Sequence, residues 1–169
     1  MFANKSNMFK RALFVFAHMD DETVSSYGTI RRMLDEGVEV VVACMCGYGR
    51  SEGFSEKRRE VFTSYSGLEA IVEIGENYDL GLTRTAAQSV FDALVDKYEP
   101  NVVITHWSHD LHFEHRLVSE VALVACRNAP GKPVKQLWYT SSPVERWTHG
   151  MLGQVFVPSF FVEVGKYEQ

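Results

Sequence analysis

The chain has 169 residues, of which 46% are hydrophobic and 23% charged, a composition typical of one globular domain. Its net charge of −5 argues against a general nucleic-acid binder, which usually presents a basic surface. No apolar run approaches the roughly 20 residues that a membrane span needs, and the polar start MFANKSNMFKR is unlike a signal peptide. We therefore expect a soluble, cytoplasmic protein.

Strand-length apolar runs alternate with amphipathic stretches of helical spacing. Turn-forming residues separate them, such as the glycines of the expected loop 47–53. In chain order we expect a strand over 12–18, a helix over 23–36, a strand over 38–46, a helix over 55–66, a strand over 70–75, a helix over 85–98, a strand over 101–106, a helix over 115–126, and strands over 135–141 and 160–164.

This alternation predicts an α/β fold. Strands joined through helices form right-handed crossovers, so the sheet is mostly parallel and covered on both faces. We expect a Rossmann-like three-layer sandwich in one domain over 1–169. Ligands of such sheets bind outside the carboxyl ends of the strands, so the active site is expected there.

The cysteines do not suggest a disulfide framework. There are three of them, Cys44, Cys46 and Cys126, and the first two have C-x-C spacing. An odd count with this spacing fits neither paired disulfides nor a zinc knuckle. We expect three buried thiols in a reducing compartment.

Two short segments carry most of the reactive side chains. The stretch FVFAHMDDET ends a strand at His18, and THWSHDLHFEHR follows the strand that ends at His106. Together they hold five of the six histidines. Both segments leave the same edge of a parallel sheet, so we expect their side chains to converge.

These residue types point to a catalytic metal site. Such sites commonly take three protein ligands from His, Asp and Glu and leave a position open. His18 and Asp21 can supply two ligands from one turn, and His115 supplies the third from the start of a helix. Asp20 is then available as a general base, and the cation offsets the repulsion between the two adjacent aspartates.

Three other interpretations stay open from the residues alone. Asp20, Asp21 and Glu22 can form an acidic first turn of a helix. His112 and His115 can be exposed residues at a helix start. A structural metal site is the third, although such sites are normally closed and richer in cysteine.

The motifs resemble those of the PIG-L/LmbE family of zinc-dependent sugar de-N-acetylases. AHMDDE resembles the family signature A-H-P-D-D-E, and HDLHFEH resembles its second signature, D-x-H-x-D-H. EKRREVF, NYDLGL, ACRNAPGKPV and FVPSFFVEV resemble further segments of the short bacterial branch, in the same order. The resemblance covers residues 11–165.

The resemblance implies roles for individual residues. His18, Asp21 and His115 would bind Zn²⁺, although two histidines and an aspartate also suit Fe²⁺. Asp20 would be the general base, and protonated His112 would stabilise the oxyanion. Glu114 would replace an aspartate that polarises His112. The expected substrate-binding residues are Arg58, Asp79, Asp110 and Tyr48.

The chain departs from the family pattern in three places. Met19 replaces a proline, and Glu114 is one methylene longer than the aspartate it replaces. Relatives continue past the last strand into a helix that we expect to be absent here, because this chain stops at GKYEQ. Either a neighbouring subunit covers that edge or the site is more open.

The expected activity is metal-dependent hydrolysis of an N-acetyl group on an N-acetylglucosamine-type amino sugar or its conjugate. The resemblance also implies a homo-oligomer, a trimer or a hexamer. Two alternatives are kept, namely a non-catalytic metal- or sugar-binding protein, and a metal-dependent amidase or esterase acting on a non-sugar molecule. Trp107, Trp138 and Trp147 are candidates for stacking on a sugar ring, with a position in the aromatic core favoured for Trp138. His106 and His109 are expected at the pocket rim.

Overall fold

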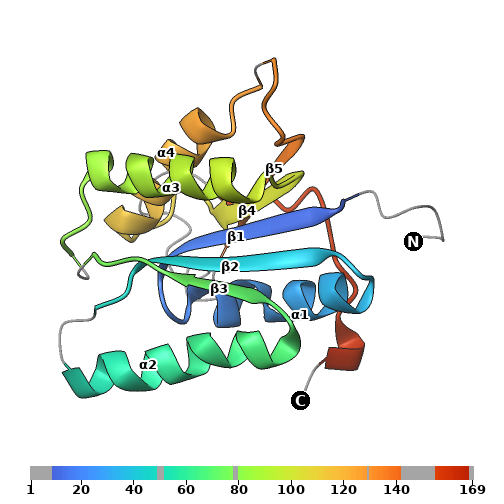
Figure 1. The fold of residues 1–169 in the computed structure, drawn as a ribbon, viewed down its shortest axis with the longest axis horizontal. Coiled ribbons are helices and arrows are strands. Elements are labelled where there is room, and N and C mark those ends of the chain that lie inside the picture. The colour runs from blue at the N-terminus through green and yellow to red at the C-terminus, as the bar shows by residue number, and fades with distance from the viewer. Residues whose placement is uncertain (1–8, 49–51, 78–79, 129, 142–154, 168–169) are drawn as a thin grey trace.

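The protein is built on one five-stranded parallel sheet (Figure 1). The structure is a computed structural model that describes residues 9–48, 52–77, 80–128, 130–141 and 155–167. The strand order is β3-β2-β1-β4-β5, with every neighbouring pair parallel. The strands are β1 (Arg11–His18), β2 (Glu39–Cys46), β3 (Ile71–Ile74), β4 (Val102–His106) and β5 (Gln136–Thr140).

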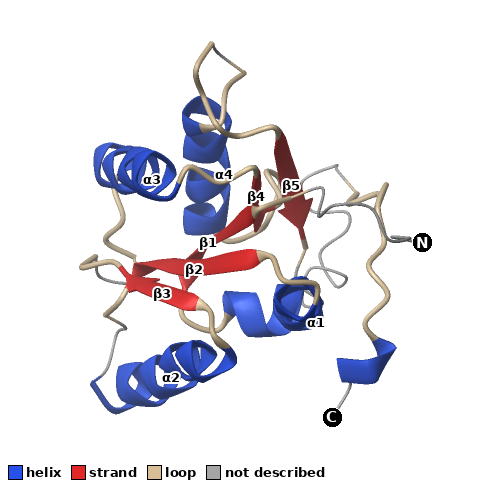
Figure 2. Ribbon diagram, turned by 45° about the vertical axis from the view of Figure 1, so that its right-hand side comes forward, coloured by secondary structure: helices blue, strands red, loops and turns tan. Residues whose placement is uncertain are grey.

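Helices cover both faces of the sheet, as the alternating pattern predicted (Figures 1 and 2). Helices α1 (Asp21–Asp35) and α2 (Glu52–Ser64) lie on one face, and α3 (Arg84–Tyr98) and α4 (Phe113–Ala125) lie on the other. In β1, Phe14 and Phe16 face the first pair of helices, while Leu13 and Val15 face the second. All four are fully buried, which explains why this strand reads as a continuous apolar run.

Helix α1 packs against the core along one face. Its buried residues are Glu22, Ser26, Ile30 and Met33, which lie on one face at helical spacing. Gly37 follows the helix with φ of 77°, a left-handed conformation that favours glycine. The sequence therefore predicted this helix to within two residues at its start.

The expected strand over 160–164 is wrong. These residues have no regular secondary structure, and a short 3₁₀ turn follows over Gly165–Tyr167. Arg32 Nη1 of α1 donates to the Glu163 carbonyl at 2.9 Å, and Val164 packs against Gly28. The segment therefore runs along α1, and Phe161 is 79% exposed. An apolar β-branched run has strand propensity, but no sheet edge pairs with it here.

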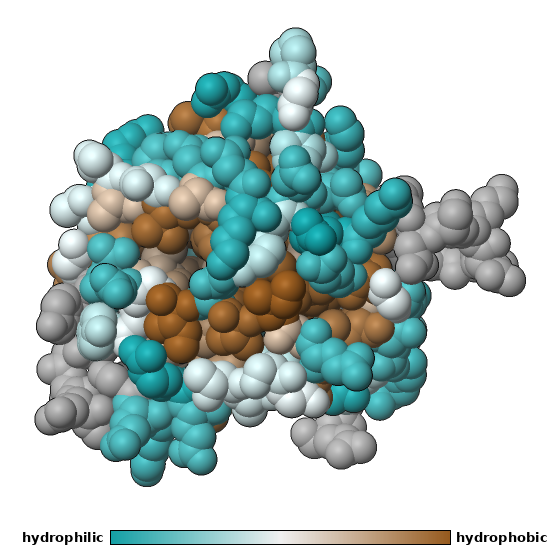
Figure 3. Space-filling view, viewed as in Figure 1, coloured by the Kyte–Doolittle hydropathy of each residue, from teal (hydrophilic) through white to brown (hydrophobic). Residues whose placement is uncertain are grey.

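Strand β3 forms an open edge of the sheet. Figure 3 shows apolar side chains gathered in a band across the face where β3 lies between α3 and α2. Ile71 is 36% exposed, and Val72 and Ile74 are half-buried. Within the described part of the chain, no strand pairs with the outer side of β3.

The cysteine prediction holds for two of the three residues. Cys44 and Cys46 are buried free thiols on β2, and Cys126 is a half-buried free thiol after α4. In the ranges that the structure covers, no helix is both long and apolar enough to cross a bilayer.

Candidate metal centre and active site

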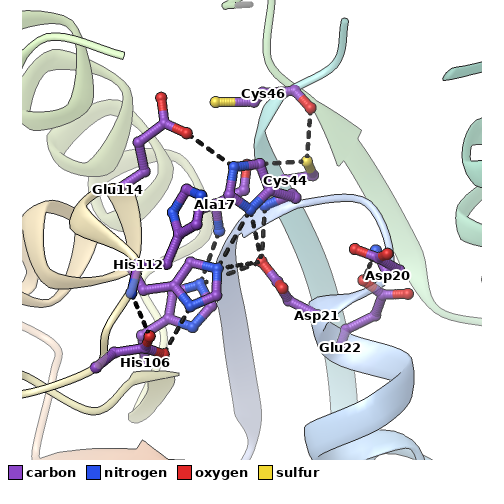
Figure 4. Close-up of polar contacts among 12 residues, drawn as sticks. Ala17, Asp20, Asp21, Glu22, Cys44, Cys46, His106, His112 and Glu114 are labelled. Atoms are coloured by element: carbon purple, nitrogen blue, oxygen red, sulfur yellow. Dashed lines mark hydrogen bonds and ion pairs between the residues drawn. The ribbon is translucent and has the colours of Figure 1, made fainter. Parts of the chain in front are cut away.

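The two segments that carry most of the reactive side chains meet at the carboxyl edge of the sheet (Figure 4). His18 ends β1 and His106 ends β4, and these strands are neighbours in the sheet. Asp21 begins α1 directly after β1, and the loop after β4 leads into α4. The parallel topology thus brings together residues nearly 100 positions apart in the chain.

Three potential ligand atoms form a nearly regular triangle. His18 Nδ1 and His115 Nε2 lie 3.2 Å apart, and each lies 3.4 Å from Asp21 Oδ2. A tetrahedral ion about 2.0–2.1 Å from its ligands separates them by about 3.3–3.4 Å. The triangle therefore fits a divalent cation such as zinc, with further positions open on one side.

Other groupings of potential ligands share residues with this centre. His18, His112 and His115 can bring one ligand atom each within 4.8 Å, as can His18, Cys46 and Glu114. A third grouping uses His106 with Asp21 and His115. His106 is not available as a ligand through Nε2, because that nitrogen accepts the Ala17 amide N–H.

His106 is buried next to the site and does not lie at the pocket rim, where we expected it. Its side chain is buried, and its Nε2 accepts a hydrogen bond from the Ala17 amide at 2.9 Å. A nitrogen that accepts an amide proton is unprotonated, so it cannot donate to Asp21 Oδ2 although it lies 3.4 Å away. The His106 ring stacks on His115 at 3.8 Å between centroids, with 6° between planes. Burial lowers the pKa of His106, in keeping with a neutral ring.

Asp110 orients His115 and lies almost out of reach of solvent. Its Oδ2 lies 2.6 Å from His115 Nδ1, which leaves His115 Nε2 facing Asp21. Its Oδ1 accepts the backbone N–H of His112 at 2.7 Å, and this hydrogen bond stabilises the start of α4. With 4% exposure, Asp110 has the contacts of a ligand-orienting carboxylate and not those of the substrate-binding residue that we expected.

In the absence of metal, the neighbouring carboxylates favour the protonated forms of His18 and His115. Burial disfavours a charge on His18, but Asp21 and Glu114 outweigh it and raise its pKa to about 9. Asp110 and Asp21 likewise outweigh burial at His115 and raise its pKa to about 10. Burial would raise the pKa of Asp21, but the surrounding imidazoles hold it well below its usual range. A site that concentrates anionic oxygen around two imidazoles also favours a cation.

Asp20 lies beside the centre but points away from the triangle (Figure 4). Its side chain is 41% exposed, and Arg58 Nη2 of α2 pairs with Asp20 Oδ2 at 2.8 Å. Partial burial and the charge of Asp21 raise the pKa of Asp20, while Arg58 works in the opposite direction. Arg58 therefore contacts the expected base, whereas the resemblance placed it near the substrate.

His112 caps α4 and faces the same centre. Its ring centroid lies 4.7 Å from those of both His18 and His115. Its buried Nδ1 has no hydrogen-bond partner in the part of the chain that the structure describes. Burial, followed by the charges of His115 and His18, lowers the pKa of His112. This direction favours a neutral ring and opposes the protonated form that the resemblance implied.

Glu114 does not contact His112 as expected. Its Oε2 lies 2.8 Å from His18 Nε2, the ring nitrogen that is not part of the triangle.

Glu22 lies buried beside the site, a position that we did not predict from the sequence. Its side chain is fully buried, and its Oε2 accepts the backbone N–H of Asp20 at 3.1 Å. Burial raises the pKa of Glu22 to about 7. A usable signal was present in the sequence, because Glu22 occupies the inward-facing stripe of α1, where a charged residue is unusual.

The remaining candidates lie apart from this centre or outside the described residues. Tyr48 is 42% exposed, and the Arg59 guanidinium lies 5.7 Å from its ring centroid. Trp107 and Trp138 line a cleft of about 810 Å³ between α1, β5 and residues 156–164, and none of the clustered histidines or acids lines it. Asp79 and Trp147 lie outside the described residues.

Asp110→Asn is expected to weaken metal binding about 10–100-fold while the protein stays folded, because the orienting partner of a metal-bound histidine contributes on this scale. Competition with a chromophoric chelator measures the change. Asp96→Asn is the control, since Asp96 is exposed and pairs only with Lys132 among the ion pairs described. Unchanged affinity in Asp110→Asn would remove Asp110 from this role.

A sequence model of one family matches much of the chain. The PIG-L model, described as GlcNAc-PI de-N-acetylase, matches residues 13–126, which include both segments that meet at this centre. This chain belongs to the PIG-L family. The signatures that suggested PIG-L from the sequence are therefore confirmed at the level of the family.

Relatives of this PIG-L chain include deacetylases. The 1D-myo-inositol 2-acetamido-2-deoxy-alpha-D-glucopyranoside deacetylase of Mycolicibacterium smegmatis is 24% identical over 195 residues, covering 91% of this chain and 67% of the relative. The N,N'-diacetylchitobiose deacetylase from Pyrococcus horikoshii has a TM-score of 0.60 at 22% identity, covering 75% of this chain and 53% of that one. The chain thus spans about half the length of that structure.

The same PIG-L fold also occurs in a protein with a different reaction. GalB, the 4-carboxy-2-hydroxymuconate hydratase from Pseudomonas putida KT2440, has a TM-score of 0.61 at 21% identity, covering 79% of this chain and 63% of that one. At such identities the structural likeness establishes the fold alone, and the α/β prediction is confirmed by it.

Proposed function

We propose that this protein is a divalent-cation-dependent deacetylase that hydrolyses the acetamide of an N-acetylglucosamine-type amino sugar or its conjugate. The single observation that carries the proposal is the triangle of His18 Nδ1, Asp21 Oδ2 and His115 Nε2, with sides of 3.2–3.4 Å, beside the acid Asp20. Membership of the PIG-L family and the acetamido sugar in the name of the Mycolicibacterium smegmatis relative support the choice of substrate class.

His18, Asp21 and His115 would hold the cation. We propose Zn²⁺ as the resident ion, and two imidazoles with one carboxylate also suit Fe²⁺. When bound, such a cation supplies Lewis acidity to a carbonyl oxygen and makes water a better nucleophile at neutral pH. Asp110 and His106 keep His115 in the orientation that this requires.

Asp20 carries the proton in the proposed reaction. Its carboxylate takes a proton from the attacking water as the water oxygen bonds to the acetamide carbon. The same carboxyl group then gives that proton to the amine nitrogen as the C–N bond breaks, so that acetate and a free amino sugar leave. The raised pKa of Asp20 brings this base closer to neutrality, where proton transfer in both directions is efficient.

His112 stabilises the charge that develops on the carbonyl oxygen. A neutral imidazole retains one N–H, and the Nδ1 atom without a described partner shows that the ring has hydrogen-bonding capacity to spare. Donation to an oxygen that becomes anionic in the transition state is worth about 10²–10³ in rate in comparable sites.

The test is a reconstitution experiment. Protein stripped with a chelator is reloaded separately with Zn²⁺ and Fe²⁺ and incubated with a panel of N-acetylglucosamine conjugates and non-sugar acetamides and acetate esters. Acetate and free amine are both measured. We expect equimolar release from an N-acetyl sugar only in the reloaded protein. Release from the non-sugar compounds alone would favour an amidase or esterase, and cation binding without any release would favour a non-catalytic binding protein.

Arg58→Gln is expected to shift the acidic limb of the kcat/KM profile to higher pH. Arg58 lowers the pKa of Asp20, so its loss raises that pKa, and the base is then ionised only at higher pH. Lys57→Gln is the matched control, because it removes one positive charge from an exposed neighbouring position of α2. A limb that stays in place in Arg58→Gln would show that another group controls it.

A further inference from the structure

Glu114 is a buried carboxylate whose hydrogen-bonding partners come from two distant segments. It lies on the inward-facing stripe of α4 with Val118 and Val121, and its side chain is fully buried. Its Oε2 lies 2.8 Å from His18 Nε2 and accepts the Leu80 N–H at 3.2 Å, and its Oε1 accepts the Leu82 N–H at 3.1 Å. Each carboxylate oxygen of Glu114 therefore already accepts a backbone N–H, and the contact with His18 adds to these.

The contact with His18 determines which ring nitrogen faces the cation. Both oxygens of Glu114 act as acceptors for backbone N–H groups, so His18 Nε2 is assigned the donor role in its 2.8 Å contact with Oε2. His18 Nδ1, which lies in the triangle with His115 and Asp21, is then the nitrogen free to bind metal. Carboxylate–histidine–metal chains of this kind fix both the tautomer and the ring orientation of the ligand.

The contacts with the other segment hold an unusual backbone conformation. Leu80 has φ of 62°, in the left-handed region that residues other than glycine rarely adopt. Its side chain is 47% exposed, so burial of the leucine does not account for the conformation. The hydrogen bonds from Leu80 N and Leu82 N to Glu114 lie at this point of the chain. The segment just before α3 is therefore attached to the same carboxylate as the metal ligand.

We propose that Glu114 is a positioning residue that fixes His18 for the cation and couples the Leu80–Leu82 segment to occupancy of the metal site. A cation held at His18 Nδ1 would strengthen the hydrogen bond that His18 Nε2–H donates to Glu114, and this bond would hold the carboxylate against the two amides. The inference rests on the proposed metal site but not on the identity of the substrate. A carboxylate that merely satisfied two backbone amides would leave metal affinity unchanged when replaced.

The first test uses the unaltered protein loaded with Zn²⁺ and labelled with ¹⁵N at histidine. We expect the NMR spectrum to show His18 bound through Nδ1, with a proton on Nε2 that exchanges slowly with water. Coordination of zinc through His18 Nε2 would overturn the proposal, and this result does not depend on whether any variant folds.

The second test is Glu114→Gln, which keeps the shape of the side chain. One arm of the amide is an NH₂ group, which cannot accept, so at least one of the three donors loses its partner in either orientation. We expect zinc affinity to fall about 10–100-fold in chelator competition. We also expect the zinc-dependent slowing of hydrogen exchange at the Leu80 and Leu82 amides to be lost.

Glu120→Gln is the matched control, because Glu120 lies on the same helix, is exposed and pairs with Arg84. It should leave both zinc affinity and exchange unchanged. Folded Glu114→Gln with native zinc affinity would overturn the inference and leave the metal site intact. Absence of zinc binding by the unaltered protein would instead overturn the proposed function.

Discussion

Asp20→Asn is expected to keep a bound divalent cation while losing a factor of about 10²–10⁴ in kcat. Asp20 is not one of the three atoms of the triangle, so its loss leaves the metal ligands in place. Asparagine has the same shape as aspartate but does not take up a proton near neutral pH. The attacking water then has no base, and the departing amine has no acid. Metal content and acetate release are the two measurements.

Asp35→Asn is the control for this variant, because Asp35 ends the same helix, is exposed and contacts Lys166 and Tyr167. It should keep full activity. Full activity in Asp20→Asn would show that another group is the base. Loss of the cation from Asp20→Asn would show instead that Asp20 is a metal ligand.

His115→Ala is expected to lose stoichiometric metal and, with it, detectable hydrolysis. The change removes one corner of the triangle and also removes the ring that stacks on His106 and pairs with Asp110. The loss in affinity should exceed the roughly 10–100-fold that is typical when only an outer partner of a ligand is removed. Metal is measured after dialysis against a weak chelator, and circular dichroism checks that the variant is folded.

His109→Ala provides the comparison within the same segment, since His109 is exposed and its ring contacts Ser108 and Trp107. It should retain the metal. If His115→Ala also retained one cation per chain, the ligand set would have to be reassigned, with His112 as the candidate replacement because its ring centroid lies 4.7 Å from that of His18.

The architecture was largely predictable because the pattern of apolar residues along the chain indicates which side chains are buried. A strand covered on both faces must be apolar throughout, and Leu13 to Phe16 satisfy this on β1. The same pattern failed at 160–164, where the apolar residues lie along α1. Hydrophobicity indicates that a segment packs against something, but it does not distinguish a strand neighbour from a helix surface.

The grouping of His18, Asp21 and His115 could be predicted because it depends on which strand ends are adjacent. The partners of these residues could not, because they depend on side-chain reach and on which nitrogen of a ring is protonated. His106 was placed at the rim, yet its ring accepts the Ala17 amide beneath the site. Glu114 was paired with His112, yet it reaches His18. In both α1 and α4, an acid in the buried stripe was the available signal.

The open edge at β3 bears on how the protein avoids aggregation. A strand with free N–H and C=O groups along one side can template pairing with another molecule. Here that strand has four residues, and Glu73 near its centre is held by Lys97 at 2.6 Å and by the Tyr98 hydroxyl. An incoming strand would gain few hydrogen bonds and would have to accommodate this charged pair. The shortness of β3 and the Glu73–Lys97 ion pair therefore disfavour pairing of this apolar edge strand with a strand of another molecule.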